Sequence, residues 1–439
     1  MTLTRASLYA AVAAVSLCSG GLLMAAQSAA PAAPTPPGRQ LGPPPGAGNL
    51  LEDDVNNAPP APVEEKPIIP VAPPQARPSR APDTSTDRTK MLLGEVEILD
   101  IPLDQIPNYR EIMRGIVTDL ATYAHARDQK FIVTTRGGFD MLAWSQREYE
   151  LAEVKRDPLA KEPADTILRV GTPLRLYIQG LNGLVLNGQF CAPLRVPHDD
   201  LDDMKKLGLK FLSIDHCKDA AGAQSALQAS IKTSVVSHTD IDRADIFTAV
   251  PKAKPQPENP RNVQVLGDAR NMLVMLDSAN YASREEWLAA LQSTNYDVLI
   301  TDAFYKGKQN LTKAEVHGLK FKQMGARRLV LARMDVGFAE DQRYYWKREW
   351  RIGEPSWIQA FVPDHPGQYV VEFWNPAWKA IVGKYFTGLM DLGFDGVVFD
   401  GVEAYRRWEF RTPLDPGQAD AARATKPRAS TAAAPAQPK

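Results

Sequence analysis

The 439-residue sequence lacks several signatures of common chemistry, and each absence excludes a class of protein. There is no His-Glu-x-x-His motif, and none of the six histidines forms a pair at the helical spacing that binds zinc, so no metal site is expected. A Gly-x-Ser-x-Gly elbow for a serine nucleophile is missing. No glycine-rich phosphate loop follows an apolar run, and no cofactor is expected either.

Concentrated charge and cysteine are also scarce. The chain carries 51 Lys and Arg residues against 52 Asp and Glu, for a net charge of −1. Nucleic-acid binding needs a concentrated basic surface, so no nucleic-acid partner is expected. Of the three cysteines, Cys18 falls in an apolar leader, and only Cys191 and Cys217 remain for the folded part. These two can form one bridge or stay as free thiols, and the protein is no disulfide scaffold.

The ends of the chain differ in composition from its middle. An apolar run from Leu8 to Met24 follows Arg5 and precedes small residues, which predicts a secretory signal peptide and a secreted or periplasmic protein. The alternative is an uncleaved membrane anchor. Pro- and Ala-rich sequence then predicts a disordered linker that allows cell-envelope association, and the C-terminal tail has a similar composition. The predicted division is signal peptide 1–28, linker 29–90, folded domain 91–411 and tail 412–439; the oligomeric state stays open.

Short apolar runs alternate with amphipathic segments between these ends. Eight runs are typical of strands: 131–135, 184–186, 211–215, 235–238, 273–277, 298–302, 329–334 and 396–400. Eight strands alternating with helices predict a (β/α)8 TIM barrel, with an open doubly wound sheet as the alternative. A ninth run, 91–99, is expected outside the barrel as an edge or lead-in.

Helix signals lie between the runs. The segment 108–127 carries four apolar side chains on one face, Ile112, Ile116, Leu120 and Ala124, which predicts an amphipathic helix. Two pairs have the spacing of capping boxes at helix starts, Ser283 with Glu286 and Thr312 with Glu315.

Acids stand at the ends of five predicted strands: Asp215, Asp277, Asp302, Asp335 and Asp400. In a barrel the carboxyl ends of the strands form the floor of the active site, so these acids are expected to converge on one mouth. Each acid taken alone is equally well explained as a helix N-cap.

Acids and aromatic rings are concentrated between residues 333 and 405. The segments RMDVGFAEDQRYYWKREW, VEFWNPAWK and GFDGVVFDGVEAY combine carboxylates with tryptophans and tyrosines. Carboxylates transfer protons, and flat rings stack on the apolar faces of sugars. The combination indicates carbohydrate chemistry with a polysaccharide substrate.

These segments, with SREEWLAAL and YDVLITD before them, resemble the endo-α-1,4-polygalactosaminidase family of glycoside hydrolases (family 114). The resemblance implies a (β/α)8 barrel that acts on galactosamine-containing polysaccharides. It covers nearly all of 105–411, but segments that follow the GFDGV strand in the family occur here at the front. The chain therefore resembles a circularly permuted barrel, in which 273–400 supplies the first four family strands, 131–238 the last four, and 248–264 the link. Strand 131–135 is expected to pair in parallel with 396–400, under helix 108–127.

The resemblance also implies a two-carboxylate site. Asp341 matches the family's catalytic aspartate, and Asp400 is expected to face it across the mouth at roughly 5–10 Å. Other residues of these motifs are expected to bind the substrate: Asp302, Glu340, Arg343, Tyr345, Trp346, Trp374, Glu403 and Tyr405. Surplus acids among them would suit the ammonium groups of a deacetylated chain. The structural alternative is that Asp400 caps the next helix, Asp341 pairs with Arg343, and Trp374 and Trp378 belong to the core.

Departures from the family pattern bear on activity. Val398 stands where polygalactosaminidases carry a catalytic glutamate, Arg136 and Gly137 replace a Gln-Asn pair, and two acids become Asn182 and Asn187. The predicted function is a secreted glycoside hydrolase that cleaves galactosamine-containing, α-1,4-linked polysaccharide. The alternative is a catalytically degenerate barrel that binds glycans or partners at the cell envelope.

Overall fold

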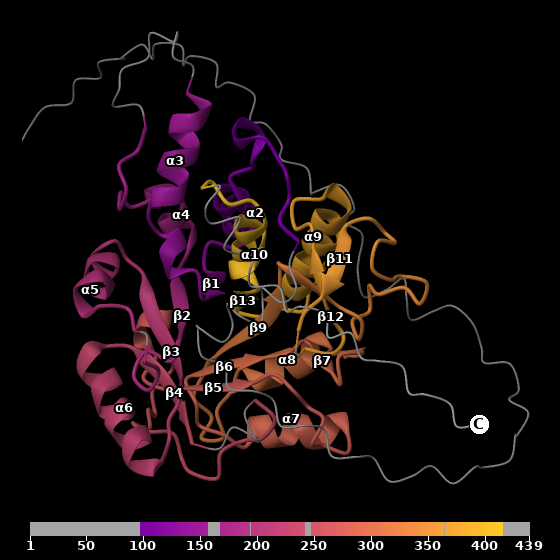
Figure 1. Cartoon of the computed structure of the whole chain (residues 1–439). Helices are drawn as coiled ribbons and strands as arrows, with labels where there is room; N and C mark the ends of the chain where they lie inside the picture. Colours follow the sequence, from indigo (N-terminus) through magenta and orange to yellow (C-terminus); the bar gives the residue numbers. More distant parts are fainter. Residues whose placement is uncertain (1–96, 157–166, 194, 242–246, 364, 416–439) are drawn as a thin grey trace, which may run out of the picture. The chain divides into compact units, whose positions relative to one another are not determined.

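Figure 1 shows the computed structural model of the chain, which describes residues 97–156, 167–193, 195–241, 247–363 and 365–415. The predicted signal peptide, the linker and all but the start of the tail lie outside these residues. So does most of the run 91–99, whose described part, 97–99, forms no strand. Within the described ranges, no helix is long and apolar enough to cross a membrane.

Eight parallel strands form the central sheet. They are β1 (Ile132–Arg136), β2 (Gly183–Asn187), β3 (Lys210–His216), β4 (Val236–Asp240), β5 (Met272–Met275), β6 (Val298–Thr301), β9 (Leu329–Asp335) and β13 (Gly396–Asp400). Their hydrogen-bonded order is β4-β3-β2-β1-β13-β9-β6-β5, and every pair is parallel. Each predicted apolar run overlaps one of these strands. Because β4 and β5, at the two ends of the sheet, also approach each other, the result is a nearly closed α/β barrel.

The neighbours of β1 bear on the predicted permutation. β1 pairs in parallel with β13, Ile132 opposite Gly396, which confirms the expected pairing of these two strands. The strands follow one another around the barrel in chain order, however, and any such barrel brings its first strand beside its last. The pairing therefore fits a permuted and an unpermuted chain equally. Among the described strands, the ladder is interrupted between β4 and β5, where the link 248–264 lies.

Helices lie outside the sheet (Figure 1). The α-helices are α2 (Tyr109–Arg127), α3 (Gln146–Lys155), α4 (Arg175–Gly180), α5 (His198–Lys206), α6 (Ala220–Thr233), α7 (Arg284–Gln292), α8 (Lys313–Leu319), α9 (Pro376–Asp391) and α10 (Tyr405–Arg411). Short 3-10 helices are η1 (Leu103–Gln105), η2 (Phe139–Met141), η4 (Leu266–Asp268) and η5 (Val402–Ala404). The capping box of Thr312 and Glu315 is confirmed at α8. At α7, Ser283 accepts from the Glu286 N–H as predicted, whereas the Glu286 carboxylate accepts from the Ala282 N–H.

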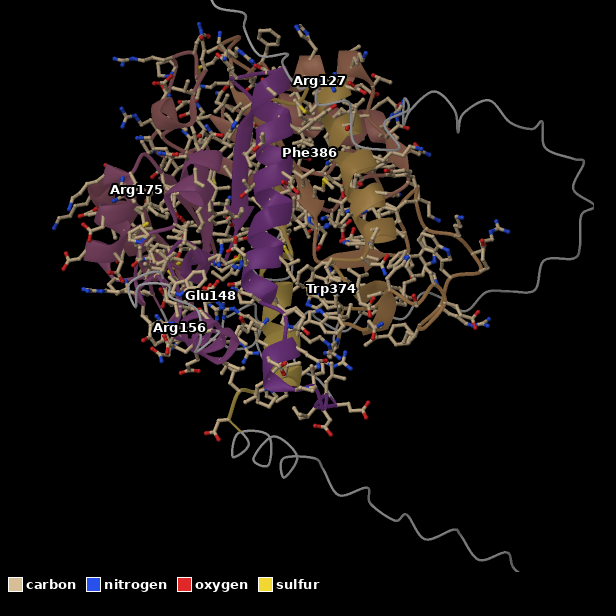
Figure 2. The ribbon with its side chains drawn as sticks, turned by 90° about the horizontal axis from the view of Figure 1, so that it is seen from above. Arg127, Glu148, Arg156, Arg175, Trp374 and Phe386 are labelled. Atoms are coloured by element: carbon tan, nitrogen blue, oxygen red, sulfur yellow. A yellow bond between two sulfur atoms is a disulfide. The ribbon has the colours of Figure 1, made fainter. Side chains whose placement is uncertain are left out.

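The helix α2 confirms the predicted helix 108–127. Asn108 caps it by accepting from the Glu111 N–H. The buried face is rotated slightly from the predicted one and comprises Tyr109, Met113, Arg114, Ile116, Val117, Ala121 and Ala124. Near the β1–β13 seam, Phe386 of α9 lies between α2 and the sheet, with ring centroids 6.4 Å from Tyr123 and 5.5 Å from Phe399 (Figure 2).

Alternate residues of each strand face the barrel interior. The interior cluster takes apolar side chains from all eight strands: Ile132, Val185, Leu212, Ile214, Val236, Met272, Val274, Val298, Ile300, Leu329, Leu331 and Val398. The residues between them, such as Val133, Leu184 and Phe399, belong to the cluster packed against the helices. Side chains alternate between the two faces of a strand. The inward side chains that follow this apolar layer therefore lie at the carboxyl ends of the strands.

Two small antiparallel sheets extend this carboxyl end. One pairs β7 (Phe304–Tyr305) with β8 (Gln309–Asn310), and the other has the order β10 (Phe338–Glu340), β12 (Gln368–Val371), β11 (Ile358–Phe361). The sequence did not predict them, because strands of two to four residues carry too little alternation to stand out.

A buried ion pair holds the opposite end of the barrel. Lys322 Nζ lies 2.6 Å from Asp297 Oδ1, and both side chains are fully buried. The same ammonium donates to the carbonyl oxygens of Asn259 and Arg261, at 2.7 and 2.9 Å. Asp297 accepts in addition from Asn259 Nδ2 and the Arg270 N–H. This pair therefore attaches the link between β4 and β5 to the second half of the barrel.

Candidate active site

Polar side chains occupy inward positions at the carboxyl ends of β1, β2, β6, β9 and β13. Two more reach them from β10 and from the turn after it. We call this set the mouth cluster. It consists of Arg136, Asn187, Asp302, Arg333, Asp335, Glu340, Arg343 and Asp400. Each carboxylate of the cluster is paired with at least one arginine of the cluster.

Asp400, at the end of β13, is only 3% exposed. Its Oδ2 lies 3.4 Å from Arg136 Nη1 and 3.3 Å from Arg333 Nε. Arg136 is itself positioned by Asn187, whose Oδ1 accepts from Nε at 2.9 Å. The Asp400 carboxylate therefore lies between two guanidinium groups. Asp400 does not cap the short helix that follows, because η5 has no side-chain cap.

Asp335 is the register partner of Asp400 on the neighbouring strand β9. Burial raises the pKa of the Asp335 carboxyl to about 7; Arg333 opposes the rise, and the negative charges of Asp400 and Glu340 add to it. A carboxyl with this pKa can hold a proton near neutral pH, as a general acid must.

Four donors surround the same carboxyl. Its Oδ1 accepts from the backbone N–H groups of Gly337 and Phe338, at 3.0 and 2.8 Å. Its Oδ2 accepts from Arg333 Nη2 at 3.0 Å and from Gln368 Nε2 at 3.2 Å. These contacts fix the orientation of Asp335 toward the mouth.

Arg333 and Arg343 share Glu340 between them. Arg333 Nη1 lies 2.5 Å from Glu340 Oε1, and Arg343 Nε donates to Oε2. Arg343 Nη1 also lies 2.8 Å from both oxygens of Asp302. Burial works against ionisation of Glu340, but the two arginines lower its pKa to about 2. Burial raises the pKa of Asp302 in spite of Arg343.

Asp341 lies outside the mouth cluster. Residues alternate along β10, so Asp341 follows Glu340 on the opposite face. The side chain is exposed, and its Oδ2 lies 3.5 Å from the Tyr369 hydroxyl. Arg343 pairs with Glu340 and Asp302, so the expected alternative of an Asp341–Arg343 pair is wrong. The catalytic role of Asp341 stays a prediction.

Two predicted sugar-binding rings lie half-buried near Asp341. The Tyr345 hydroxyl accepts from the Glu340 N–H at 3.0 Å. Trp346 stacks on Tyr369, with centroids 4.5 Å apart and an interplanar angle of 27°. Tyr369, which the sequence did not single out, therefore joins Trp346 as a candidate contact for a sugar chain.

Three other predicted contacts serve the framework. Trp374 packs beside α2 (Figure 2), with centroids 5.2 Å from Tyr109 and 4.6 Å from Trp408. Tyr405 is fully buried and donates its hydroxyl to Asp140 Oδ2 at 2.6 Å, so it has no ring face for a sugar. Glu403 accepts from the Gly138 N–H and pairs with Arg406, at 3.2 and 3.0 Å. Trp378 is buried in the core, which was the structural alternative to a role in sugar binding.

The expected convergence of strand-end acids holds for Asp302, Asp335 and Asp400 and is wrong for two others. Asp215 faces away from the interior and accepts from the Phe190 N–H at 2.6 Å and the Ser213 hydroxyl at 2.5 Å. Asp277 accepts from the Ala279 N–H, in a local turn. A position at a strand end does not decide which face a side chain takes.

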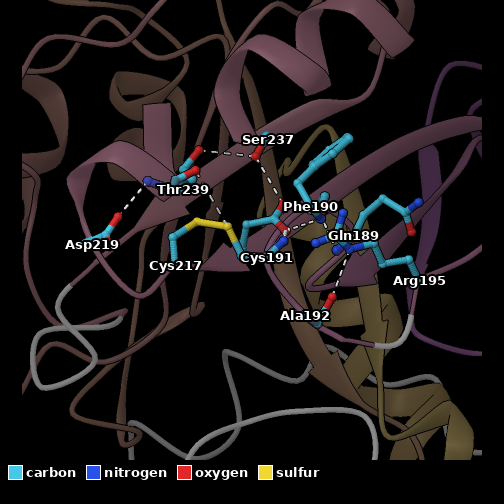
Figure 3. The surroundings of a disulfide bond; sticks show 12 residues. Gln189, Phe190, Cys191, Ala192, Arg195, Cys217, Asp219, Ser237 and Thr239 are labelled. Atoms are coloured by element: carbon cyan, nitrogen blue, oxygen red, sulfur yellow. Dashed lines mark hydrogen bonds between the residues drawn. A yellow bond between two sulfur atoms is a disulfide. The ribbon is translucent and has the colours of Figure 1, made fainter. Parts of the chain in front are cut away.

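Cys191 and Cys217 form a disulfide bond (Figure 3). The bond joins the turns that follow β2 and β3, and Asp215 accepts from the Cys191 N–H at 3.1 Å. The structure thus decides between the bridge and the free thiols that the sequence left open.

Arg136, Arg333 and Gln368 complete the site, and the sequence did not predict their roles. Arg333 carried a usable signal, because it stands two residues before Asp335 and therefore on the same face of β9. Arg136 stood out only as a departure from a family pattern. Gln368 carried no signal, since it reaches Asp335 from a short strand 33 residues away. In the ranges that the structure describes, no three metal-ligating side chains gather into a site.

The fold and the mouth cluster define an α/β barrel with neighbouring carboxylates at its carboxyl end, an arrangement that suits glycoside hydrolysis. Comparison with known families agrees, because residues 279–434 match the model of glycoside-hydrolase family GH114. The matched segment includes every carboxylate of the mouth cluster; its last residues, 416–434, lie outside the described part. The front half of the barrel lies outside the match, so the wider resemblance over 105–411 stays a prediction.

The chain also matches parts of curated relatives. The chain is 29% identical over 157 residues to an uncharacterized protein of Methanocaldococcus jannaschii, which is 36% of this chain and 44% of the relative. It is 32% identical over 124 residues to an uncharacterized protein of Deinococcus radiodurans, 28% of this chain and 39% of the relative. The chain thus spans less than half the length of these relatives.

A solved structure of the glycoside hydrolase domain of PelA from Pseudomonas aeruginosa is also similar in part. The sequence identity is 18% and the TM-score 0.21, over 31% of this chain and 46% of that chain. Similarity at this level does not bear on the chemistry of the mouth cluster.

Proposed function

We propose that this protein is a secreted glycoside hydrolase that cleaves galactosamine-containing, α-1,4-linked polysaccharide with two carboxylates. The observation that carries the proposal is the pair Asp335 and Asp400. They are register partners on neighbouring strands within the segment that matches GH114, and their surroundings differ. One carboxyl can hold a proton near neutral pH, and the other lies between two guanidinium groups.

The two carboxyls would divide the reaction as follows. Asp335 donates its proton to the glycosidic oxygen of the leaving chain, while ionised Asp400 attacks the anomeric carbon and forms a glycosyl–enzyme bond. Water then attacks the same carbon, Asp335 takes up its proton, and the bond to Asp400 breaks. The backbones of neighbouring strands lie about 4.8 Å apart. We therefore expect the carboxyl groups of Asp335 and Asp400 to lie nearer the roughly 5–5.5 Å of retaining enzymes than the wider distance of inverting enzymes. We expect products with retained anomeric configuration.

Asp341 is the competing acid, because the family resemblance assigns catalysis to it. The test compares Asp335→Asn with Asp341→Asn, both close in shape to the original residue, by reducing-end release from galactosamine oligomers. We expect Asp335→Asn to lose about 10²-fold or more of the activity, the usual contribution of a general acid. Asp341→Asn should lose less than about tenfold, because it lies outside the cluster. The reverse order would assign the acid to Asp341, and full activity in both variants would reject catalysis by either residue. Melting curves confirm that each variant is folded.

A second candidate function is a glycan-binding barrel without activity. One observation favours it: each carboxylate of the mouth cluster is already paired with an arginine. The family resemblance adds that Val398 stands where relatives carry a catalytic glutamate. In this case the wild-type protein binds the polymer and releases no shorter chains at any pH from acid to neutral. Trp346→Ala should weaken binding under either function, because its ring lies beside the candidate site.

Circular permutation is part of the proposal. Two observations support it: the ladder is interrupted between β4 and β5, where the family order would begin and end, and the Leu99 N–H donates to the Arg411 carbonyl at 2.7 Å. The ends of the described barrel are therefore adjacent and can be joined by a short connection. A chain reopened within 248–264 and joined between 97 and 415 should fold with a melting temperature close to that of the original. Failure of this chain to fold, while the original folds, would argue against the permutation.

We also propose that the protein acts outside the cytoplasm, attached near the cell envelope by its linker. Support comes from the Cys191–Cys217 bond, since disulfides persist in oxidising compartments. Fractionation of cells that produce the full chain, with and without residues 1–28, tests the location. Recovery of the full chain in the cytoplasm with both thiols reactive would contradict it.

A further inference from the structure

The ring of Phe247 lies against an arginine of the mouth cluster, and the backbone that holds the ring there is strained. We propose that Phe247 is a positioning residue, whose ring holds the Arg136 guanidinium beside Asp400. Because Asp400 reacts with the sugar in the proposed hydrolase, this role of Phe247 rests on that proposed function. Phe247 carried no signal in the sequence, since it belongs to no predicted strand or helix.

The backbone of Phe247 has a φ of 62°, in the left-handed region. A side chain crowds the following carbonyl oxygen in this conformation, so a bulky residue is uncommon there. The Phe247 carbonyl accepts from the N–H groups of Leu276 and Asp277, at 2.9 and 2.8 Å, which fixes this backbone beyond the end of β5. Strain of this kind persists only where neighbouring contacts hold it, and it is concentrated at functional sites.

The Phe247 ring lies at the mouth of the barrel. It packs on the interior cluster and is 8% exposed. The ring centroid lies 5.4 Å from Arg136 Cζ, at the end of β1, and 6.2 Å from the ring centroid of His216, at the end of β3. The backbone that carries the ring is bound beyond β5, on the opposite side of the barrel from β1. Phe247 and Arg136 therefore meet over the mouth from opposite sides.

Arg136 needs such a support because its contact with Asp400 is long. Arg136 Nη1 lies 3.4 Å from Asp400 Oδ2, near the limit of a hydrogen bond, whereas Arg136 Nε donates to Asn187 Oδ1 at 2.9 Å. An aromatic ring attracts a guanidinium over its face, and the attraction is stronger where water is excluded. Asn187 therefore fixes one edge of the guanidinium, and the Phe247 ring fixes its plane.

Loss of the ring would allow the guanidinium to tilt away from Asp400. Arg333 Nε, 3.3 Å from the same carboxylate oxygen, would still hold Asp400 in the mouth, but from one side only. A nucleophile that is slightly misplaced attacks more slowly, although the sugar chain binds as before. If Phe247 served core packing alone, its replacement would lower the stability of the fold and leave the rate per folded molecule unchanged.

The kinetic test measures cleavage of α-1,4-linked galactosamine oligomers by the full chain. Phe247→Leu keeps an apolar side chain without the ring, and it should lower kcat by about tenfold or more with little change in KM. Phe247→Tyr keeps the ring and should restore most of kcat. Phe211→Leu is the matched control, because it removes a buried ring that packs against the helices; it should lower the stability and leave kcat unchanged.

A double variant separates positioning from packing. In a chain that already carries Arg136→Met, Phe247→Leu should have no further effect on kcat, because the group that the ring positions is gone. Losses that multiply in the double variant would assign Phe247 to core packing and would overturn the proposal.

A spectroscopic measurement needs neither substrate nor activity. A proton over the face of an aromatic ring resonates upfield, and the Arg136 guanidinium lies over the Phe247 ring. The Nε–H signal of Arg136, assigned by its loss in Arg136→Lys, should therefore lie upfield in the wild type and in Phe247→Tyr. In Phe247→Leu it should move to the ordinary position of an arginine.

The two measurements distinguish the failure of this role from the failure of the proposed function. An upfield Arg136 signal in a wild-type protein that cleaves no oligomer would reject the hydrolase, while the contact that positions Arg136 stands. Cleavage by the wild type with an unchanged kcat in Phe247→Leu would overturn the positioning role. An Arg136 signal at the ordinary position in the wild type would overturn it as well, even if Phe247→Leu does not fold.

Discussion

The titration of Asp335 can be tested without any substrate. Its pKa in the folded protein is about 7, against an ordinary value of 3.8. The folded state therefore keeps this proton to higher pH than the unfolded chain, and ionisation disfavours the folded state. The protonated Asp335 carboxyl therefore stabilises the folded state fully below about pH 4, and this stabilisation is lost as the pH rises through about 7. The difference between these two pKa values corresponds to about 4 kcal/mol in the free energy of unfolding.

Asp335→Asn removes the titration. The four donors around the carboxyl fit an amide less well, so the variant carries an offset from lost hydrogen bonds, but this offset does not depend on the Asp335 proton. We therefore compare free energies of unfolding from urea titrations across pH 5 to 8. The value for Asp335→Asn minus that for the wild type should rise by about 3 kcal/mol over this range.

Asp140→Asn is the matched control. Burial opposes ionisation there, but Arg406 and Arg110 hold the pKa of Asp140 below its usual value, so it is ionised in both states across pH 5 to 8. Its difference from the wild type should stay flat. A flat difference for Asp335→Asn would show that the four donors keep Asp335 ionised, and its assignment as the general acid would fail.

Two further predictions concern stability. Lys322→Met leaves Asp297 buried without its cation and should lower the free energy of unfolding by about 3–5 kcal/mol. Lys320→Met removes the cation of a partly exposed pair and should lower it much less. Equal losses in urea titrations would refute the role of burial. Cys191→Ser opens a bridge between residues 26 apart and should lower the free energy of unfolding by about 3.5 kcal/mol by the chain-entropy relation. A reductant should destabilise the wild type by a similar amount and leave the variant unchanged; an unchanged wild type would contradict the prediction.

The sequence by itself determined the eight strands, the helix 108–127 and the starts of the helices after Ser283 and Thr312. Strand residues recur as short apolar runs, and caps such as Asn108 and Thr312 act on N–H groups three residues away, so the information is local. The strand order followed as well, because short connections in a parallel barrel bring consecutive strands together. The family motifs indicated a glycoside hydrolase from the segment that the GH114 match also covers.

Only the tertiary structure decided which acids meet. A side chain changes face with every residue along a strand, so Asp215 points away from the interior while Asp400 points into the mouth. The arginine that contacts Asp400 from β1 stands 264 residues away in the chain, and no local pattern couples the two positions. The charge state of the mouth depends on such long-range pairs and on burial together, which is why Asp335, and not Asp341, became the proposed acid.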